Sequence, residues 1–170
     1  PRRLVLFDLS EHNLYQIDQD LQALRQARKL DVEVVALLGS VHHRDRVRGA
    51  IAAFGVQTLY HAAAYKHVPI VEYNMIEGIH NNVISTWYTA EAAHECGVET
   101  FVLISTDKAV NPTNVMGATK RFAELVLQAM EQRGYSLVRD DDGPADGLPS
   151  DGGDLLLQRG NERILLSCKY

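Results

Sequence analysis

Four short, mostly apolar runs alternate with helix-like segments along the chain, and this alternation constrains the fold most strongly. The runs are typical of buried strands and cover residues 4–7, 32–38, 58–61 and 100–105. Strands that alternate with helices pair in parallel through right-handed crossovers, and continuous apolar strands belong to sheets covered on both faces. The chain is therefore predicted to form an α/β fold with a doubly wound parallel sheet.

Helices are predicted where apolar residues recur at a spacing of three or four. Ser10 is the predicted N-cap of the first helix, and Gly55 is predicted to end the second. The apolar faces are marked, in chain order, by Leu14, Ile17, Leu21 and Leu24; by Val47, Ala50, Ile51 and Phe54; by Val83, Trp87 and Ala90; and by Phe122, Leu125, Val126 and Met130. Loops are predicted around Pro69 and over residues 106–114.

The composition changes at Arg139. The stretch DDDGPADGLPSDGGD holds six aspartates, four glycines and two prolines, too little apolar surface to offset the entropy of ordering it. We expect two parts: a nucleotide-binding domain over residues 1–138 and a divergent, disordered tail over residues 139–170. Leu155–Leu157 and Ile164–Leu166 are compatible with either a short strand pair or unstructured chain.

Charge and cysteine content exclude several classes of function. Seventeen basic against 22 acidic residues give a net charge of -5, so nucleic acid is not an expected partner. Two cysteines, Cys96 and Cys168, are too few for a disulfide framework and lack the paired spacing of a zinc site. His42 and His43 are adjacent rather than spaced as ligands, so no metal is expected. No Gly-x-Ser-x-Gly motif supports acyl transfer.

Candidate site residues gather where the strands end, because ligands of open α/β sheets bind outside the carboxyl ends of the strands. Asp8 ends the first strand, where a carboxylate either accepts hydrogen bonds from a cofactor ribose or caps the next helix. The third strand ends in HAAAYKH, whose alanines either admit a flat cofactor or serve tight packing. Lys66 and His67 either reach a phosphate or sugar or are simply solvated.

The fourth strand leads into ISTDKAVNPTNVMGATK, the most concentrated chemical signal in the chain. Thr106, Asp107 and Lys108 place a hydroxyl, a carboxylate and an ammonium in succession, and Lys120 follows on the next helix. Taken singly they are turn or surface residues. Together they form a group that can transfer protons.

Three motifs, DLSEHNLYQID, HAAAYKHVPIVEYN and LISTDKAVNPTNVMGATKR, resemble the extended short-chain dehydrogenases/reductases. The resemblance is to the polysaccharide-biosynthesis nucleotide-sugar 4,6-dehydratases, whose typical substrate is UDP-N-acetylglucosamine, and spans residues 4–133. It implies a Rossmann-like fold that binds NAD or NADP. It also implies removal of water from a UDP-sugar through a transient hydride transfer at C4.

Carried over position by position, the resemblance assigns two sets of residues. The cofactor set is Asp8, Ser10, Ala62, Ala63, Lys66, Asn82 and Lys120. The catalytic set is Thr106, Asp107, Lys108, Met116 and Lys120. It implies that Asp107 protonates the departing 6-hydroxyl and that Lys108 removes the C5 proton. Met116 stands where the family usually has tyrosine, as in a methionine-bearing branch of these dehydratases.

Departures from the family pattern suggest a fragment of a longer enzyme. The glycine-rich strand, turn and helix expected before Leu4 are absent, and Ser40 follows Gly39 where the family usually has an aspartate near the adenine. Activity of this fragment by itself is therefore an open question. Two other functions stay open: an epimerase or reductase of the same fold, and a non-catalytic nucleotide-binding module.

The resemblance also bears on partners and location. It leaves room for a membrane anchor upstream of Pro1 and for a homo-oligomer. The expected location is the cytoplasm, either as a free protein or as the cytoplasmic domain of an inner-membrane protein.

Overall fold

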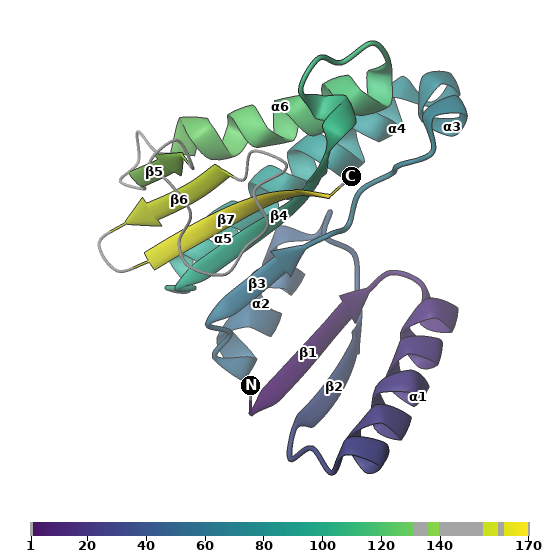
Figure 1. The fold of residues 1–170 in the computed structure, drawn as a ribbon, viewed down its shortest axis with the longest axis vertical. Helices are drawn as coiled ribbons and strands as arrows, with labels where there is room; N and C mark the ends of the chain where they lie inside the picture. The colour runs from purple at the N-terminus through teal and green to yellow at the C-terminus, as the bar shows by residue number, and fades with distance from the viewer. Residues whose placement is uncertain (1, 131–135, 140–154, 160–161, 170) are drawn as a thin grey trace.

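The computed structural model describes residues 2–130, 136–139, 155–159 and 162–169 (Figure 1). The strands are β1 (Arg3–Asp8), β2 (Glu33–Leu38), β3 (Thr58–His61), β4 (Thr100–Thr106), β5 (Ser136–Arg139), β6 (Leu155–Arg159) and β7 (Glu162–Lys169). The α-helices are α1 (Glu11–Arg28), α2 (Arg44–Phe54), α3 (Val68–Tyr73), α4 (Met75–Ile79), α5 (Ser85–Glu95) and α6 (Val115–Met130). A π-helical turn, η1 (His80–Ile84), joins α4 to α5, and a 3-10 turn, η2 (Asp107–Ala109), follows β4.

The strands fall into two sheets. β1 and β2 pair in parallel, and β3, β4 and β7 form a second parallel set. Beyond β7, strands β6 and β5 continue the second sheet in antiparallel fashion. The predicted α/β class with parallel strands is confirmed by this topology and by the similarity to solved structures given below. The single sheet expected from the alternation is divided, because β1 is not hydrogen-bonded to β3.

Burial follows this division. Three consecutive residues of β4, Phe101 to Leu103, are buried as predicted, whereas no residue of β1 or β2 is fully buried. Full coverage of both faces was therefore a wrong expectation for the first two strands. The physical reason is visible in Figure 1, where α1 packs beside β1 and β2 and the sheet does not continue from β1 to β3.

The helix ends use the predicted capping chemistry. The Ser10 hydroxyl accepts a hydrogen bond from the Asn13 N–H at 3.3 Å, and Gly55 ends α2 in the left-handed region with φ 57°. The loop predicted around Pro69 is instead helical, as α3 and α4. Pro69 lies in the first turn of α3, where its missing N–H would have had no helical partner anyway.

The apolar face predicted for α6 was partly wrong. Phe122 and Leu125 are exposed, whereas the buried side carries Met116, Lys120 and Glu124. The hydrophobic pattern predicts the wrong side of the helix because two of the inward-facing residues, Lys120 and Glu124, are charged. Along α2 and α5, by contrast, the predicted Val47, Ile51 and Ala90 belong to the core; the full core cluster is Val47, Ile51, Ala90, Ala92, Ala93, Val98, Phe101, Leu103, Ala123, Leu127 and Met130.

Two segments of the predicted disordered tail are strands. β6 pairs with β7 from Leu155↔Leu166 to Arg159↔Glu162, so the strand-pair alternative describes these segments. Their runs of leucine and isoleucine supply the apolar strand character that the aspartate-rich stretch lacks. Residues 140–154, on which the disorder expectation mainly rested, lie outside the described residues, and the division at residue 138 stays a prediction.

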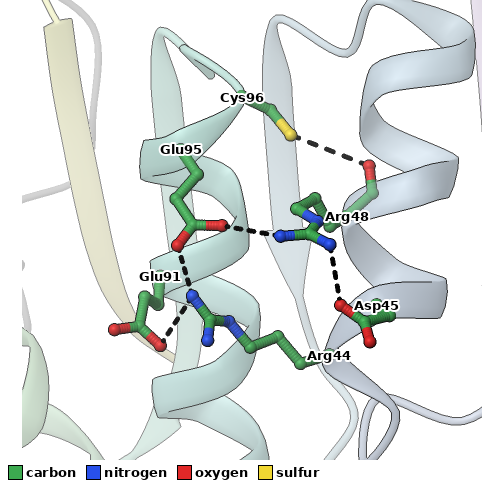
Figure 2. A network of polar contacts seen from close by, with 6 residues as sticks. All are labelled: Arg44, Asp45, Arg48, Glu91, Glu95 and Cys96. Atoms are coloured by element: carbon green, nitrogen blue, oxygen red, sulfur yellow. Dashed lines mark hydrogen bonds and ion pairs between the residues drawn. The ribbon is translucent and has the colours of Figure 1, made fainter.

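A charged network on the outer side joins α2 to α5 (Figure 2). Arg44 pairs with Glu95 and, at 3.3 Å, with Glu91. Arg48 pairs with Asp45 at 2.9 Å and with Glu95 at 3.6 Å. These groups are partly exposed, so the network orients two helices whose attraction comes mainly from the core beneath them. Among the described helices, none has both the length and the apolar character needed to cross a membrane.

Candidate active site

Three segments that are far apart in the sequence meet in one cleft of about 450 Å³. They are the end of β3, the end of β4 with the turn η2, and the first half of α6. The cleft is lined by Ala62, Ala64, Lys66, Ile104, Ser105, Thr106, Lys108, Met116 and Lys120. The carboxyl ends of neighbouring parallel strands meet at one edge, which explains why the cleft forms there.

Asn82 joins two of these segments, the loop after β3 and α6. Its side chain is 1% exposed and binds both backbone polar groups of Tyr65: Oδ1 accepts from the N–H at 2.7 Å and Nδ2 donates to the carbonyl at 3.0 Å. The same Nδ2 donates to Thr119 Oγ1 on α6 at 2.9 Å. Asn82 therefore sets the course of the loop after β3 relative to α6.

The first turn of α6 is held by two side chains and one close contact. Asn114 Oδ1 accepts from the Gly117 N–H at 2.8 Å, and Glu72 Oε1, from α3, accepts from the Val115 N–H at 2.6 Å. Both oxygens satisfy N–H groups that the helix itself cannot. Gly117 lets this turn approach η2, because a Cβ there would lie 2.4 Å from the Lys108 carbonyl oxygen.

Lys120 points from α6 toward the end of β4 and is 6% exposed. Its Nζ donates to the Ile104 carbonyl at 2.7 Å. Burial lowers the pKa of Lys120 to about 8, while the charge of Glu124 acts in the opposite direction. An ammonium with such a pKa is a strong hydrogen-bond donor and gives up its proton more readily than an exposed lysine.

Thr106, Asp107 and Lys108 form a consecutive polar group, of which Thr106 and Lys108 line the cleft and Asp107 does not. The Thr106 hydroxyl donates to Asp107 Oδ1 at 2.8 Å, and Lys108 Nζ lies 3.5 Å from the same oxygen. The hydrogen bond from Thr106, with the nearby Lys108 ammonium, lowers the pKa of Asp107. The carboxyl is ionised in this arrangement, so a role as proton donor requires the bond from Thr106 to be exchanged for one to a ligand.

Met116 lies at the wall of the cleft and is 3% exposed. A thioether has no proton to transfer, so at this position the site offers shape and apolar contact only. The residues with exchangeable protons that line the same space are Lys66, Ser105, Thr106, Lys108 and Lys120.

Asp8 and Ser10 lie at the end of β1 and do not line this cleft. Asp8 Oδ1 accepts from the Ser10 N–H at 2.7 Å, and Ser10 rather than Asp8 is the N-cap of α1. Ala63 also does not line the cleft, and its carbonyl accepts from Asn81 Nδ2 at 3.3 Å. Their contacts with a cofactor stay predictions, as do the roles assigned to the other site residues.

Two residues near the site were not singled out from the sequence. Glu72 caps α6 from α3, but a capping residue 43 positions away leaves no local signal. Glu124 is 7% exposed, and its spacing of four from Lys120 was the signal that could have placed it on the same side of α6. Neither carboxylate lines the cleft: Glu72 accepts from a backbone N–H, and Glu124 binds neighbouring side chains.

Parallel βα units with a polar cleft at the strand ends define the class, a Rossmann-type domain. A solved structure of this class, a double mutant of DesIV, a dTDP-glucose 4,6-dehydratase from Streptomyces venezuelae, contains NAD. It matches with a TM-score of 0.62 and 19% identity, over 77% of this chain and 42% of that one. The family described as polysaccharide biosynthesis protein matches residues 1–139, and the chain belongs to this family.

The curated relatives include a polysaccharide biosynthesis protein, a nucleotide-sugar dehydratase and a nucleotide-sugar epimerase. The chain is 44% identical to the capsular polysaccharide biosynthesis protein CapD of Staphylococcus aureus, over 78% of this chain and 22% of that protein. It is 46% identical to a UDP-N-acetylglucosamine 4,6-dehydratase (inverting) of Campylobacter jejuni, over 51% of this chain and 26% of that protein. It is 32% identical to a UDP-glucose 4-epimerase of Rickettsia canadensis, over 71% of this chain and 35% of that protein. The chain thus spans about a quarter to a third of the length of these relatives.

Proposed function

We propose that this chain forms part of a NAD(P)-dependent nucleotide-sugar 4,6-dehydratase that acts on a substrate like UDP-N-acetylglucosamine in surface polysaccharide biosynthesis. The observation that carries the proposal is the consecutive group Thr106, Asp107 and Lys108, in which Asp107 is bound to Thr106 while Thr106 and Lys108 line one cleft with Lys120. An elimination needs an acid for the leaving group and a base for the neighbouring proton. The consecutive carboxylate and amine supply this pair.

The cleft suits the nicotinamide end of the cofactor. Lys120 uses one N–H on the Ile104 carbonyl and has two more for ribose hydroxyls. Ala62 and Ala64 at the end of β3 present only methyl groups to the cleft, which leaves room for a flat ring. NAD(P), when bound, supplies a hydride acceptor for sugar C4 and a hydride donor for C6. These contacts involve only the nicotinamide end, which NAD and NADP share, so they fit either cofactor.

The remaining steps fall to the chain's own residues. Oxidation at C4 makes the proton at C5 acidic, and Lys108 in its neutral form removes it. The C6–O bond breaks as Asp107 protonates the departing hydroxyl, which leaves as water. The proton taken up by Lys108 exchanges with solvent, and Lys108 then delivers a solvent-derived proton to C5. Because Met116 cannot accept a proton, Thr106 or a water relays the 4-hydroxyl proton, and Lys120 stabilises the negative charge that develops there.

An epimerase of the same fold is the second candidate, supported by the relatives of that name. Epimerisation at C4 requires proton and hydride transfer at that carbon alone. It makes no use of an acid and base beside C5 and C6. Met116 at the cleft wall and the pair Asp107 and Lys108 therefore favour the dehydratase.

Removal of the acid tests this assignment. The protein is prepared at the length of its curated relatives and incubated with UDP-N-acetylglucosamine and NAD, and the loss of one water is followed by mass spectrometry. Asp107→Asn is expected to slow water loss by about 10²–10⁴-fold, the usual contribution of a general acid. The matched control is Asp45→Asn on the exposed side of α2, which is expected to retain wild-type turnover. Equal rates in wild type and Asp107→Asn would contradict the assignment.

A further inference from the structure

Glu124 is a buried carboxylate that lies next to the cleft without lining it. It follows Lys120 by one helical turn and is 7% exposed. A buried carboxylate is costly unless both oxygens are bound, and here both are. Oε1 accepts from the Ser105 hydroxyl at 2.5 Å, and Oε2 accepts from Arg121 Nη1 at 2.9 Å.

The bond to Ser105 connects Glu124 to the catalytic strand. Ser105 is the residue directly before Thr106, it is buried, and it lines the cleft. One residue earlier, the Ile104 carbonyl accepts from Lys120 Nζ. Two consecutive residues of β4 are therefore bound by two residues of α6 spaced one turn apart. These two hydrogen bonds fix the position of the end of β4 relative to Lys120.

Glu124 also influences the charge of the cleft. The groups around Lys120 are cationic or neutral: Lys66 and Lys108 line the same cleft, and His61 on β3 is coupled to Lys120 electrostatically. Arg121 is paired with Glu124 itself. Asp107 does not line the cleft; it is exposed and bound to Thr106 and Lys108. Glu124 is thus the buried negative charge that supports the proton on Lys120.

We propose that Glu124 is a positioning residue of the site, which acts through Ser105 on the end of β4 and through its charge on the protonation of Lys120. The role assigned to the catalytic strand rests on the proposed dehydratase function, whereas the influence on Lys120 does not. A carboxylate that merely filled space would affect neither the orientation of β4 nor the titration of the lysine.

Two substitutions separate the two actions. Glu124→Gln keeps an oxygen that can accept from Ser105 but removes the charge. Ser105→Ala removes the hydrogen bond but keeps the charge. The titration of Lys120 is followed in this chain by NMR of ¹³Cε-labelled lysine, with its resonance assigned from its loss in Lys120→Arg. Glu77→Gln, on the exposed side of α4, is the matched control for a lost carboxylate.

In Glu124→Gln the midpoint of Lys120 is expected to fall by about one pH unit, because a nearby buried charge is worth at least that much. In Ser105→Ala the midpoint of the Lys120 titration is expected to stay within a few tenths of a pH unit. When the same substitution is made in the protein at the length of its relatives, kcat is expected to fall about tenfold, with KM for the sugar nearly unchanged. The double variant is expected to show both effects, because the two substitutions remove different interactions.

A folded Glu124→Gln protein whose Lys120 titrates as in wild type would overturn the proposal, and so would a Ser105→Ala protein with wild-type kcat. If Glu124→Gln does not fold, the Ser105→Ala result decides. The NMR titration needs no turnover. If the wild-type protein releases no water, the dehydratase function fails while the effect of Glu124 on Lys120 is still measured.

Discussion

His61 shows how strongly a buried environment changes the pKa of a single residue. Its ring is buried at the end of β3, and Nε2 lies 3.0 Å from Thr86 Oγ1. The Thr86 hydroxyl donates to the Asn82 carbonyl, so it accepts from His61 Nε2–H. Burial, aided by the Lys120 charge, lowers the pKa of His61 to about 4. The residue is therefore a neutral hydrogen-bond donor of the scaffold.

This lowered pKa predicts an acid-sensitive stability. The unfolded chain takes up a proton on this histidine near pH 6.5, whereas the folded chain does so only near pH 4, so the free energy of unfolding falls as the pH drops through this window. The full effect is on the order of 3 kcal/mol for a shift of this size. Urea unfolding at pH 7 and pH 4 measures it. His61→Gln, which keeps an N–H for Thr86, is expected to flatten the dependence; an equally steep fall in that variant would contradict the mechanism.

Individual site residues could be predicted from the sequence where they belong to one contiguous motif. Thr106, Lys108, Met116 and Lys120 were singled out and do line one cleft. Glu124 was missed because its importance depends on a bond to a strand residue 19 positions earlier. A side chain that acts across elements becomes visible only when the elements are placed.

The central element of the site is α6, whose N-terminal turn is pressed against η2. Gly117 makes this contact possible, since a Cβ would meet the Lys108 carbonyl oxygen at 2.4 Å. The neighbour is backbone, so it cannot move without displacing Asp107 and Lys108. The placement of the predicted acid and base thus depends on a glycine in the following helix.

Two glycine substitutions test this contact. In a helix interior Gly→Ala usually stabilises, by up to about 1 kcal/mol. A Cβ at Gly49 in α2 would meet no atom within 4 Å, so Gly49→Ala is expected to raise the free energy of unfolding by this amount. Gly117→Ala is expected to lower it by about 1–3 kcal/mol, as overpacked sites do. Equal effects of the two substitutions in urea unfolding would argue against the close contact.

Elements were predicted well where burial and periodicity agree, as for β4 and α2. The helices α3 and α4 were missed because their sequence carries Pro69 and a mixture of exposed apolar and polar residues without a clear stripe. Tertiary contacts, including the Glu72 cap on α6, stabilise these short helices instead of intrinsic propensity.

On the scale of the whole molecule, burial is unevenly distributed. Among residues 2–39, Leu14 alone is buried, whereas β4, α5 and α6 supply most of the core. The break between β1 and β3 means that no backbone hydrogen bonds join the two sheets there. The division of the sheet could not be predicted from the alternation, because the alternation indicates which strands are parallel and not which are neighbours.

This uneven burial predicts two levels of local stability. Amide hydrogens of β1 and β2 are expected to exchange through openings of much lower free energy than those of β4, because few apolar contacts oppose the opening. Native-state hydrogen exchange, read by mass spectrometry on peptides from each strand, measures the difference. Equal protection of β1 and β4 would show that the two sheets unfold as one unit.

The isotope content of the sugar product tests the central claim, a 4,6-dehydratase site, most directly. The protein at the length of its relatives is incubated in D₂O with UDP-N-acetylglucosamine and NAD, and the product is examined by NMR and mass spectrometry. The proposed chemistry predicts a 4-keto-6-deoxy sugar with one deuterium at C5, delivered by Lys108, and a C6 hydrogen that comes from C4. An unchanged sugar mass, or a C4 epimer without deuterium at C5, would contradict the dehydratase assignment.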